Sequence, residues 1–310
     1  MRDAFTAALQ ALAAKDKNIF LITGDLGFAV LKPYWETYPG QFFNAGISEQ
    51  AMTGMAAGMA LEGKTVFTYS IGNFPTLRCL EQIRNDCAYH HANVKIVCVG
   101  GGFVYGSLGM SHHATEDMAI LRALPDVTVF APGDPEEVRA VMPVLAAHPG
   151  TCYLRLGRGG EPTIHKAPIS DYRLGQAICL REGDQAVLFS SGGILTQTMA
   201  AAEQLSGRGI RVGVFSFPTL KPIDEGLIRR LAKEVPLIAT VEEHTVIGGL
   251  GGAVCEVVGG MQGSRARILR IGMQDQYTAI VGTQQYLREK YGMDSASIAK
   301  KVEEALGERL

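Results

Sequence analysis

The chain lacks the features that mark several large classes of protein. None of its six cysteines is spaced as CxxC, and each stands alone in an apolar context. Its 29 basic and 31 acidic residues nearly cancel, giving a net charge of −2, so we expect no polycationic surface for nucleic acid. The longest run without charged or strongly polar residues, 96–106, is shorter than the roughly 18 residues that span a bilayer. We therefore expect no nucleic-acid partner and no membrane span, and buried thiols in a reducing cytoplasm.

Fingerprints of common cofactors and metals are missing as well. The glycine-rich segment 99–117, VGGGFVYGSLGMSHHATED, does not follow the dinucleotide spacing GxGxxG, and the chain has no GKS/T phosphate loop. Its two adjacent histidines, His112 and His113, are poorly spaced for two ligands of one zinc ion, and no HExxH motif accompanies them. The residues therefore predict no metal site in this chain.

What the chain has is an alternation of short β-branched runs and longer helical stretches. Its 310 residues correspond to about two domains of roughly 150 residues each, and 37 glycines and 47% hydrophobic residues are typical of a compact α/β protein. In the first half the pattern predicts a doubly wound parallel sheet with helices on both faces. The expected strands are 18–23, 64–69, 94–99, 127–131 and 151–156, and the expected helices are 2–15, 48–61, 75–92, 116–123 and 134–147.

A second alternation follows a segment rich in glycine, proline and charge. We predict a first domain over 1–165, a linker over 166–184 and a smaller α/β domain over 185–310. In the second domain we expect strands at 185–190, 210–215, 237–242 and 266–271, helices at 194–206, 224–233 and 250–258, and terminal helices at 283–291 and 295–306.

Three places in the first half carry residues suited to chemistry. Glu49 stands in the first turn of the helix that follows FFNAGIS, Phe74 lies at a strand-to-helix turn, and His112 and His113 end the glycine-rich loop. Taken singly, Glu49 is better explained as a carboxylate that complements the helix dipole, and Phe74 as a core aromatic. The histidines follow the carboxyl end of a predicted parallel strand, where open α/β sheets bind ligands.

Together these segments resemble a known family. ISEQ at 47–50, the aromatic turn with QIR at 82–84, and the stretch from GMSHHATED to APGD resemble the pyrimidine-binding domain of thiamine-diphosphate enzymes of the transketolase family. The segment TVEEHTVIGGLGGAVCEVV, 240–258, resembles the third domain of transketolase and of 1-deoxyxylulose-5-phosphate synthase. The resemblance covers nearly the whole chain and implies a thiamine-diphosphate (pyrimidine) domain followed by a transketolase C-terminal domain.

For the cofactor, the resemblance implies three contacts. Glu49 matches the glutamate that hydrogen-bonds N1′ of the aminopyrimidine ring and so favours the tautomer whose 4′-imino group removes the thiazolium proton. Phe74 lies within one position of the aromatic residue that stacks on this ring. Asp25, in ITGDLG, matches an acidic position near the cofactor.

For the substrate, the resemblance implies a histidine and two arginines. His112 matches the histidine that faces the substrate hydroxyls, while His113 replaces a common glutamine. Arg158, in RLGRGG, and Arg2 match arginines that bind a sugar phosphate, and a guanidinium suits that anion. Glycines at 100–102 replace a histidine of the family's usual phosphate site, so the resemblance does not extend to the usual phosphate site and its pentose substrates.

One half of the family's cofactor site is missing. The diphosphate is normally held through Mg²⁺ by a preceding domain marked GDG and a later Asn, whereas this chain contains only GDL, GDP and GDQ. The resemblance therefore implies an N-terminal partner subunit that carries this GDG motif and Mg²⁺, and a heterotetramer of two plus two chains. The chain is then the C-terminal subunit of a split transketolase, which transfers a two-carbon ketol unit between sugar phosphates.

Other functions remain open at this point. The β subunit of a 2-oxoacid dehydrogenase has nearly the same length and an ISEQ-like segment, although MSHHATED and Arg158 disfavour it. Acetolactate-type decarboxylases order their domains differently. A non-catalytic subunit that keeps the fold to bind a partner would not need Glu49, Asp25 and His112 together.

Overall fold

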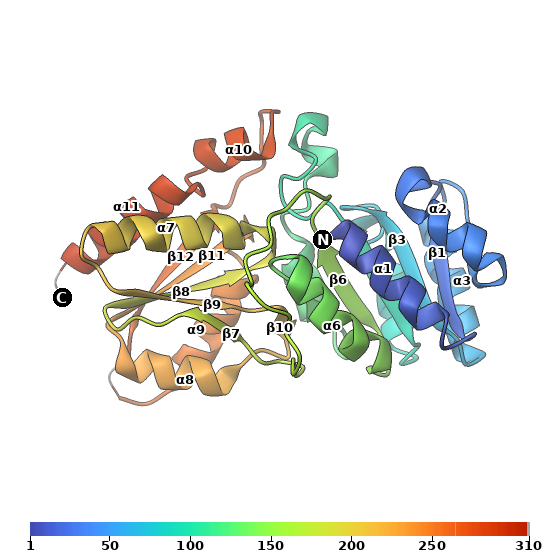
Figure 1. The fold of residues 1–310 in the computed structure, drawn as a ribbon, viewed down its shortest axis with the longest axis horizontal. Coiled ribbons are helices and arrows are strands. Elements are labelled where there is room, and N and C mark those ends of the chain that lie inside the picture. Colours follow the sequence, from blue (N-terminus) through green and yellow to red (C-terminus); the bar gives the residue numbers. More distant parts are fainter. Residues whose placement is uncertain (264, 309–310) are drawn as a thin grey trace.

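The computed structural model describes residues 1–263 and 265–308, which form two α/β units side by side (Figure 1). The first unit is built on a seven-stranded sheet of order β10-β5-β6-β4-β3-β1-β2. Six of its strands, β1 to β6, pair in parallel, and β10 joins antiparallel to β5. The strands are β1 Ile19–Thr23, β2 Phe42–Asn44, β3 Thr65–Ile71, β4 Val94–Val99, β5 Thr128–Phe130, β6 Cys152–Leu156 and β10 Thr219–Lys221.

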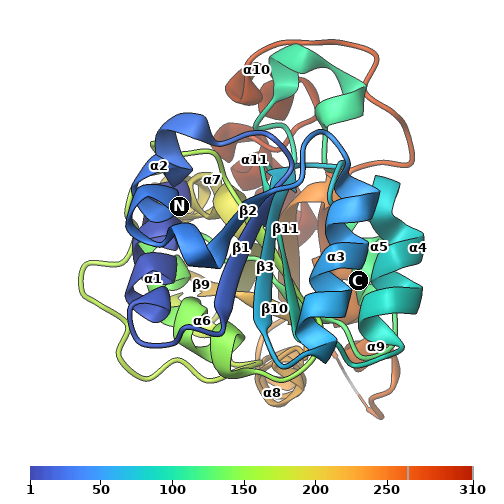
Figure 2. The same cartoon turned by 90° about the vertical axis from the view of Figure 1, so that its right-hand side faces the viewer.

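Helices cover both faces of this sheet, as Figure 2 shows end-on. On one face lie α1 (Arg2–Ala13), α2 (Phe28–Thr37) and α6 (Pro135–Ala147), whose buried side chains share one core cluster. On the other lie α3 (Glu49–Leu61), α4 (Leu80–Gln82) and α5 (Asp117–Ala123), which pack into a second cluster. Apart from β2, the parallel strands are largely buried, so their sequences are mostly apolar, as in other doubly wound folds. The predicted fold class is confirmed.

The second unit is smaller, with five strands in the order β12-β11-β8-β9-β7. These are β7 Ile178–Arg181, β8 Ala186–Ser191, β9 Val212–Ser216, β11 Leu237–Thr245 and β12 Arg267–Met273. One face is covered by α7 (Leu195–Gly207) and α11 (Ser295–Gly307), and the other by α8 (Glu225–Glu234) and α9 (Leu250–Gly259). The short helix α10 (Gln284–Lys290) lies beside the loop that follows β4 (Figure 1).

Some elements were not expected from the sequence. They are α2, which contains Pro33, and the strands β2, β7 and β10, each of three or four residues and so too short to show a periodicity. β7 lies within the predicted linker 166–184, and the boundaries of that linker stay a prediction. The expected helix 75–92 is interrupted, since α4 passes into a wider π-helical turn over Ile83–Ala88. Among the described residues, no helix is both long and apolar enough to cross a membrane.

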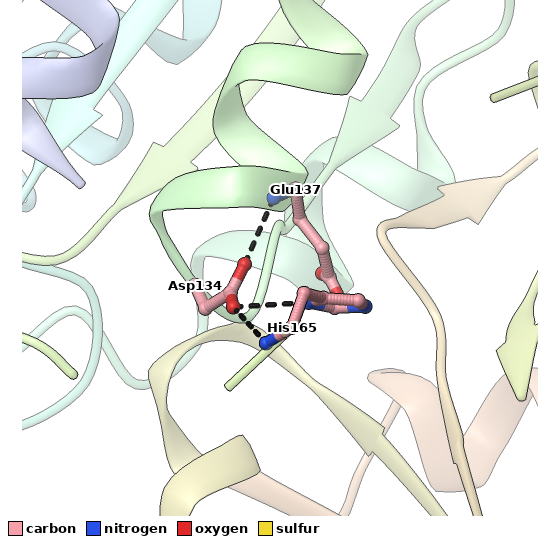
Figure 3. Close-up of side chains that lie close together, drawn as sticks. All are labelled: Asp134, Glu137 and His165. Carbon is pink, nitrogen blue, oxygen red and sulfur yellow. Dashed lines mark hydrogen bonds and ion pairs between the residues drawn. The ribbon is translucent and has the colours of Figure 1, made fainter. Parts of the chain in front are cut away.

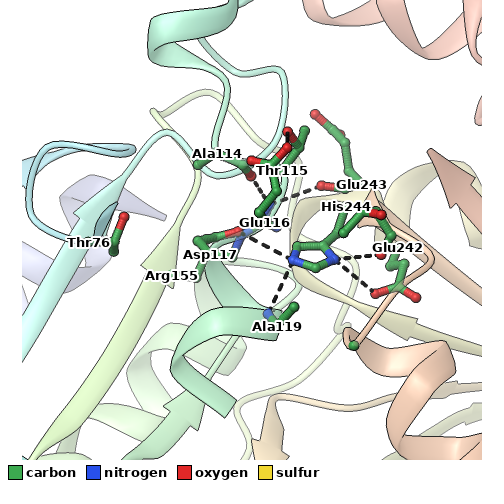
Figure 4. Close-up of polar contacts among 12 residues, drawn as sticks. Thr76, Ala114, Thr115, Glu116, Asp117, Ala119, Arg155, Glu242, Glu243 and His244 are labelled. Carbon is green, nitrogen blue, oxygen red and sulfur yellow. Dashed lines mark hydrogen bonds and ion pairs between the residues drawn. The ribbon is translucent and has the colours of Figure 1, made fainter. Parts of the chain in front are cut away.

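Three consecutive buried side chains at the end of β11 make hydrogen bonds, and two of them, Glu243 and His244, join the second unit to the first (Figure 4). Glu242 accepts hydrogen bonds from the backbone N–H groups of Leu250 (2.7 Å) and Gly251 (2.9 Å), at the start of α9. Glu243 accepts one from the backbone of Phe103 (2.6 Å), in the glycine-rich loop of the first unit. His244 Nδ1 faces the Thr245 carbonyl (2.7 Å), which leaves Nε2 to accept from the backbone N–H of Ala119 in α5 (3.3 Å). Burial lowers the pKa of His244 to about 4.

A buried ion pair lies beside this junction. Arg155 of β6 donates from Nε to Asp117 at the start of α5 (2.8 Å), and both side chains are almost fully buried. Arg155 also donates to the backbone carbonyls of Ala114 (2.8 Å) and Glu243 (3.0 Å). The loop after β4, which carries both candidate histidines, is therefore held from β6 and from β11.

Candidate functional site

The candidate residues gather at the carboxyl ends of the parallel strands of the first sheet. Each follows a different strand of that sheet, and they are Asp25 after β1, Glu49 after β2, Phe74 after β3, His112 after β4 and Arg158 after β6. Because parallel strands end at one edge of a sheet, residues that are distant in the sequence meet there. This is the ligand-binding edge expected for a doubly wound fold.

Glu49 is a buried carboxylate with a single charged partner. It is the first residue of α3 and is 2% exposed. Its Oε2 accepts a hydrogen bond from Arg78 Nη1 at 2.9 Å, and its Oε1 lies 3.4 Å from the Ser70 hydroxyl, which donates to it. The preceding Ser48 occupies the N-cap position but makes no side-chain capping bond, and Glu49 is the acidic residue in the first turn of the helix. A carboxylate held in this way can accept or share a proton with a ligand.

A row of side chains leads away from Glu49. The Arg78 guanidinium carbon lies 4.5 Å from the centroid of the Phe74 ring, and Phe74 meets His112 edge-on at 5.1 Å. The His112 ring is followed by Tyr105 at 6.5 Å, and Arg158 lies 5.6 Å from the Tyr105 centroid. We call this set the site row, and its members are Glu49, Arg78, Phe74, His112, Tyr105 and Arg158. It joins a buried acid at one end to an exposed cation at the other.

The remaining predicted residues lie beside the row. The Arg2 guanidinium approaches Gly159, since Nη2 would lie 3.7 Å from a Cβ at that position, and so the two candidate arginines are neighbours. Asp25 has a positive φ of 57° and accepts a hydrogen bond from the Asn44 amide at 2.9 Å. His113 is 2% exposed, and its Nε2 faces the Gly106 carbonyl at 3.2 Å. Its ring supports the loop from inside, and its role as a substrate contact stays a prediction.

Two members of the site row, Arg78 and Tyr105, were not expected from the sequence. A Cβ at Gly100, where φ is +94°, would lie 2.2 Å from Tyr105 Cε2, so the tyrosine ring covers the glycine. Burial raises the pKa of Tyr105, although the positive charges of Arg158 and Arg2 act to lower it. The glycine run 100–102 was the available signal, because a glycine next to a packed ring implies a close approach.

A cavity of about 330 Å³ lies between the two units, and Arg158 is one of the residues that line it. Its walls combine backbone of the glycine-rich segment after β6 with Gly192 and Gly193 at the start of α7 and with side chains of α10. Arg158 and Arg288 are two of the cationic residues that line the cavity, and Arg288 Nε donates a hydrogen bond to Glu243. Arg158 thus borders both this cavity and the Tyr105 ring.

A second polar cluster lies at the start of α6 (Figure 3). Asp134 Oδ2 accepts hydrogen bonds from the backbone N–H groups of Ile164 (2.8 Å) and His165 (3.0 Å), and from His165 Nδ1 (2.9 Å). Glu137 Oε1 lies 3.7 Å from His165 Nε2, and burial raises the pKa of Glu137 to about 7. Because the Asp134 carboxylate is already used by these donors and by the Glu137 N–H, the cluster fastens the segment after β6 to α6.

Known proteins resemble the chain along its whole length. Residues 1–161 match the family described as "Transketolase, pyrimidine binding domain", and residues 175–298 match "Transketolase, C-terminal domain". An apulose-4-phosphate transketolase subunit of Phocaeicola vulgatus is 34% identical over 300 residues, which cover 96% of this chain and 95% of that protein. The 6-deoxy-6-sulfo-D-fructose transketolase subunit SqwH of a Clostridium species is 34% identical over 306 residues, covering 98% of this chain and 94% of that protein.

A solved structure agrees with these matches. It is described as "Split gene transketolase, inactive beta4 tetramer", and it superposes with a TM-score of 0.87 at 34% identity, covering 99% of this chain and 97% of its own. The expected likeness to 1-deoxyxylulose-5-phosphate synthase is confirmed too, although this chain spans only 47% of such an enzyme from Syntrophotalea carbinolica. The chain therefore belongs to the transketolase family of thiamine-diphosphate enzymes, and it spans nearly the full length of relatives that are separate transketolase subunits.

Proposed function

We propose that this chain is the C-terminal subunit of a split, thiamine-diphosphate-dependent transketolase that transfers a two-carbon ketol unit between sugar phosphates. It works with an N-terminal subunit that holds Mg²⁺ and the diphosphate, in a heterotetramer of two plus two chains. Six unpaired cysteines support a reducing compartment such as the cytoplasm.

The observation that carries the proposal is the pairing of Glu49 with Phe74 at the sheet edge. A buried carboxylate and a half-buried aromatic ring fit the two contacts that an aminopyrimidine needs, a hydrogen bond to a ring nitrogen and a face to stack on. When bound, thiamine diphosphate supplies a carbanion that accepts and releases the ketol unit. Glu49 holds the proton at the pyrimidine nitrogen, and Phe74 orients the ring.

The diphosphate end of the cofactor finds no comparable set of residues. Hard oxygen ligands are needed for Mg²⁺, and the sequence contains no GDG. Among the described residues, the one group of three with metal-ligand types is Asp134, Glu137 and His165. Asp134 and Glu137 follow β5, His165 follows β6, and their contacts fasten the segment after β6 to α6. This absence of a fit supports a partner subunit, as do the names of the relatives.

The cationic end of the site row supports a phosphorylated substrate. Arg158 and Arg2 are neighbours, and Arg158 is exposed beside the cavity, so both can face an anion. His112 lies between this end and Phe74, where it can donate a hydrogen bond to a substrate oxygen. The relatives are named for apulose 4-phosphate and for 6-deoxy-6-sulfo-D-fructose, each of which carries an anionic group on a sugar. These features favour ketol transfer over the 2-oxoacid dehydrogenase and scaffold alternatives.

The test uses this chain reconstituted with an N-terminal subunit that contains GDG. Glu49→Gln keeps the size of the side chain and removes the shared proton, so turnover should fall on the order of 10²-fold or more while assembly is retained. Glu62→Gln, at the exposed end of the same helix, is the matched control and should change neither turnover nor assembly. Near-normal turnover of Glu49→Gln, or full activity of this chain alone with Mg²⁺ and cofactor, would overturn the proposal.

A further inference from the structure

We infer that Arg78 occupies the position that the aminopyrimidine ring would take and has to leave it when thiamine diphosphate binds. The inference rests on the proposed function, since it assumes that Glu49 and Phe74 receive the pyrimidine ring. It adds an arginine that acts as the counter-ion of Glu49 and as a competitor of the cofactor.

The contacts of Arg78 are the first argument. Its Nη1 donates to Glu49 Oε2 at 2.9 Å, while its guanidinium carbon lies 4.5 Å from the Phe74 centroid. A guanidinium is flat, carries N–H donors at its edge and binds aromatic faces. A protonated aminopyrimidine has the same three properties. Both groups would therefore use the same carboxylate oxygen and the same aromatic face, and they cannot occupy them together.

The burial of Glu49 gives a reason for the arrangement. The carboxylate is 2% exposed, and its side-chain partners are Arg78 and the more distant Ser70 hydroxyl. A buried carboxylate without a counter-charge is unfavourable, so Glu49 is stabilised by a neighbouring cation. When a ligand nitrogen shares a proton with Glu49, the carboxylate is compensated by the ligand instead, and Arg78 is no longer needed there.

The exposure of Arg78 shows that it can leave. Its side chain is 47% exposed, and within the described residues its one hydrogen bond is the bond to Glu49. Its backbone is anchored separately, because the Gln50 amide donates to the Arg78 carbonyl at 3.1 Å. Rotation of the side chain toward solvent thus breaks the ion pair with Glu49 and the contact with the Phe74 ring, and it leaves the backbone in place.

The experiment compares Arg78→Ala with Arg84→Ala in the full chain, using thiamine as the probe because it carries the pyrimidine without the diphosphate. Arg84 is an exposed arginine of the following turn that bonds to Asn85. Calorimetric titration of Arg78→Ala should give thiamine binding about two- to fivefold tighter than wild type, the size of a half-exposed ion pair. The Arg84 variant should bind as wild type does. Without ligand, Arg78→Ala should lower the melting temperature, and a cycle with Glu49→Gln should show that the two residues are coupled.

The outcomes separate the two proposals. If Arg78→Ala binds thiamine as weakly as wild type or more weakly, or if the coupling to Glu49 is absent, the inference is wrong and the proposed function stands. If neither wild type nor any variant binds thiamine, and the reconstituted pair does not bind thiamine diphosphate, the proposed cofactor is wrong and the inference falls with it.

Discussion

The ion pair between Arg155 and Asp117, which lies beside the junction of the two units, offers a test of how much a buried charge pair contributes to stability. Asp117→Asn keeps the shape of the side chain but leaves the Arg155 charge without its partner in a site where both residues are at most 4% exposed. Removing one member of a buried pair typically costs about 3 to 5 kcal/mol, mostly because the remaining charge is buried and uncompensated. The variant should therefore lose about this much free energy of unfolding, measured by urea denaturation of the isolated chain.

Two further variants decide whether burial is the cause. Asp184→Asn breaks the ion pair with Arg211, where both side chains are about two-thirds exposed, and should leave stability unchanged. In the double variant Asp117→Asn, Arg155→Met no charge is left unpaired, so it should recover part of the loss. The reasoning would be refuted if Asp117→Asn were as stable as Asp184→Asn. It would also be refuted if the double variant were less stable than Asp117→Asn alone.

Three other predictions follow from single positions. Gly100→Ala should destabilise the chain by more than about 1 kcal/mol in thermal unfolding, because φ is +94° and the new methyl group would lie 2.2 Å from Tyr105. The control Gly54→Ala, where the new methyl group on α3 meets open space, should stabilise the chain by about 0.5 kcal/mol. Burial lowers the pKa of His244 from 6.5 to about 4, so on acidification the unfolded chain binds the proton before the folded chain does. About 3 kcal/mol of the free energy of unfolding should therefore be lost as the pH falls from 6.5 to 4. In His244→Asn this part of a profile of stability against pH should be flatter. In the reconstituted enzyme, Arg158→Ala should raise KM for a phosphorylated acceptor roughly ten- to a hundredfold and leave an unphosphorylated one unaffected; an equal effect on both would make this arginine structural.

The sequence by itself determined the elements and their order. Alternating apolar runs and helical periods report the local backbone, and they predicted the doubly wound class and all parallel strands of both sheets except β2. Because parallel strands share one carboxyl edge, the predicted strand before His112 and His113 indicated that these residues lie at a ligand-binding edge. Glu49 follows β2, which was not expected, so its link to the other candidates came from the family resemblance. Short elements such as β10, which crosses from the second half of the chain into the first sheet, carried no such signal.

The tertiary structure alone decided which side chains touch. Arg78 reads as one more cation on a helical segment, and only folding brings its guanidinium over Phe74 and onto Glu49. Glu243 reads as a strand residue, yet it binds the backbone of Phe103, which is 140 residues away. Such contacts depend on the packing of distant elements and on the desolvation of each polar group, whereas sequence periodicity records only the geometry of neighbouring residues.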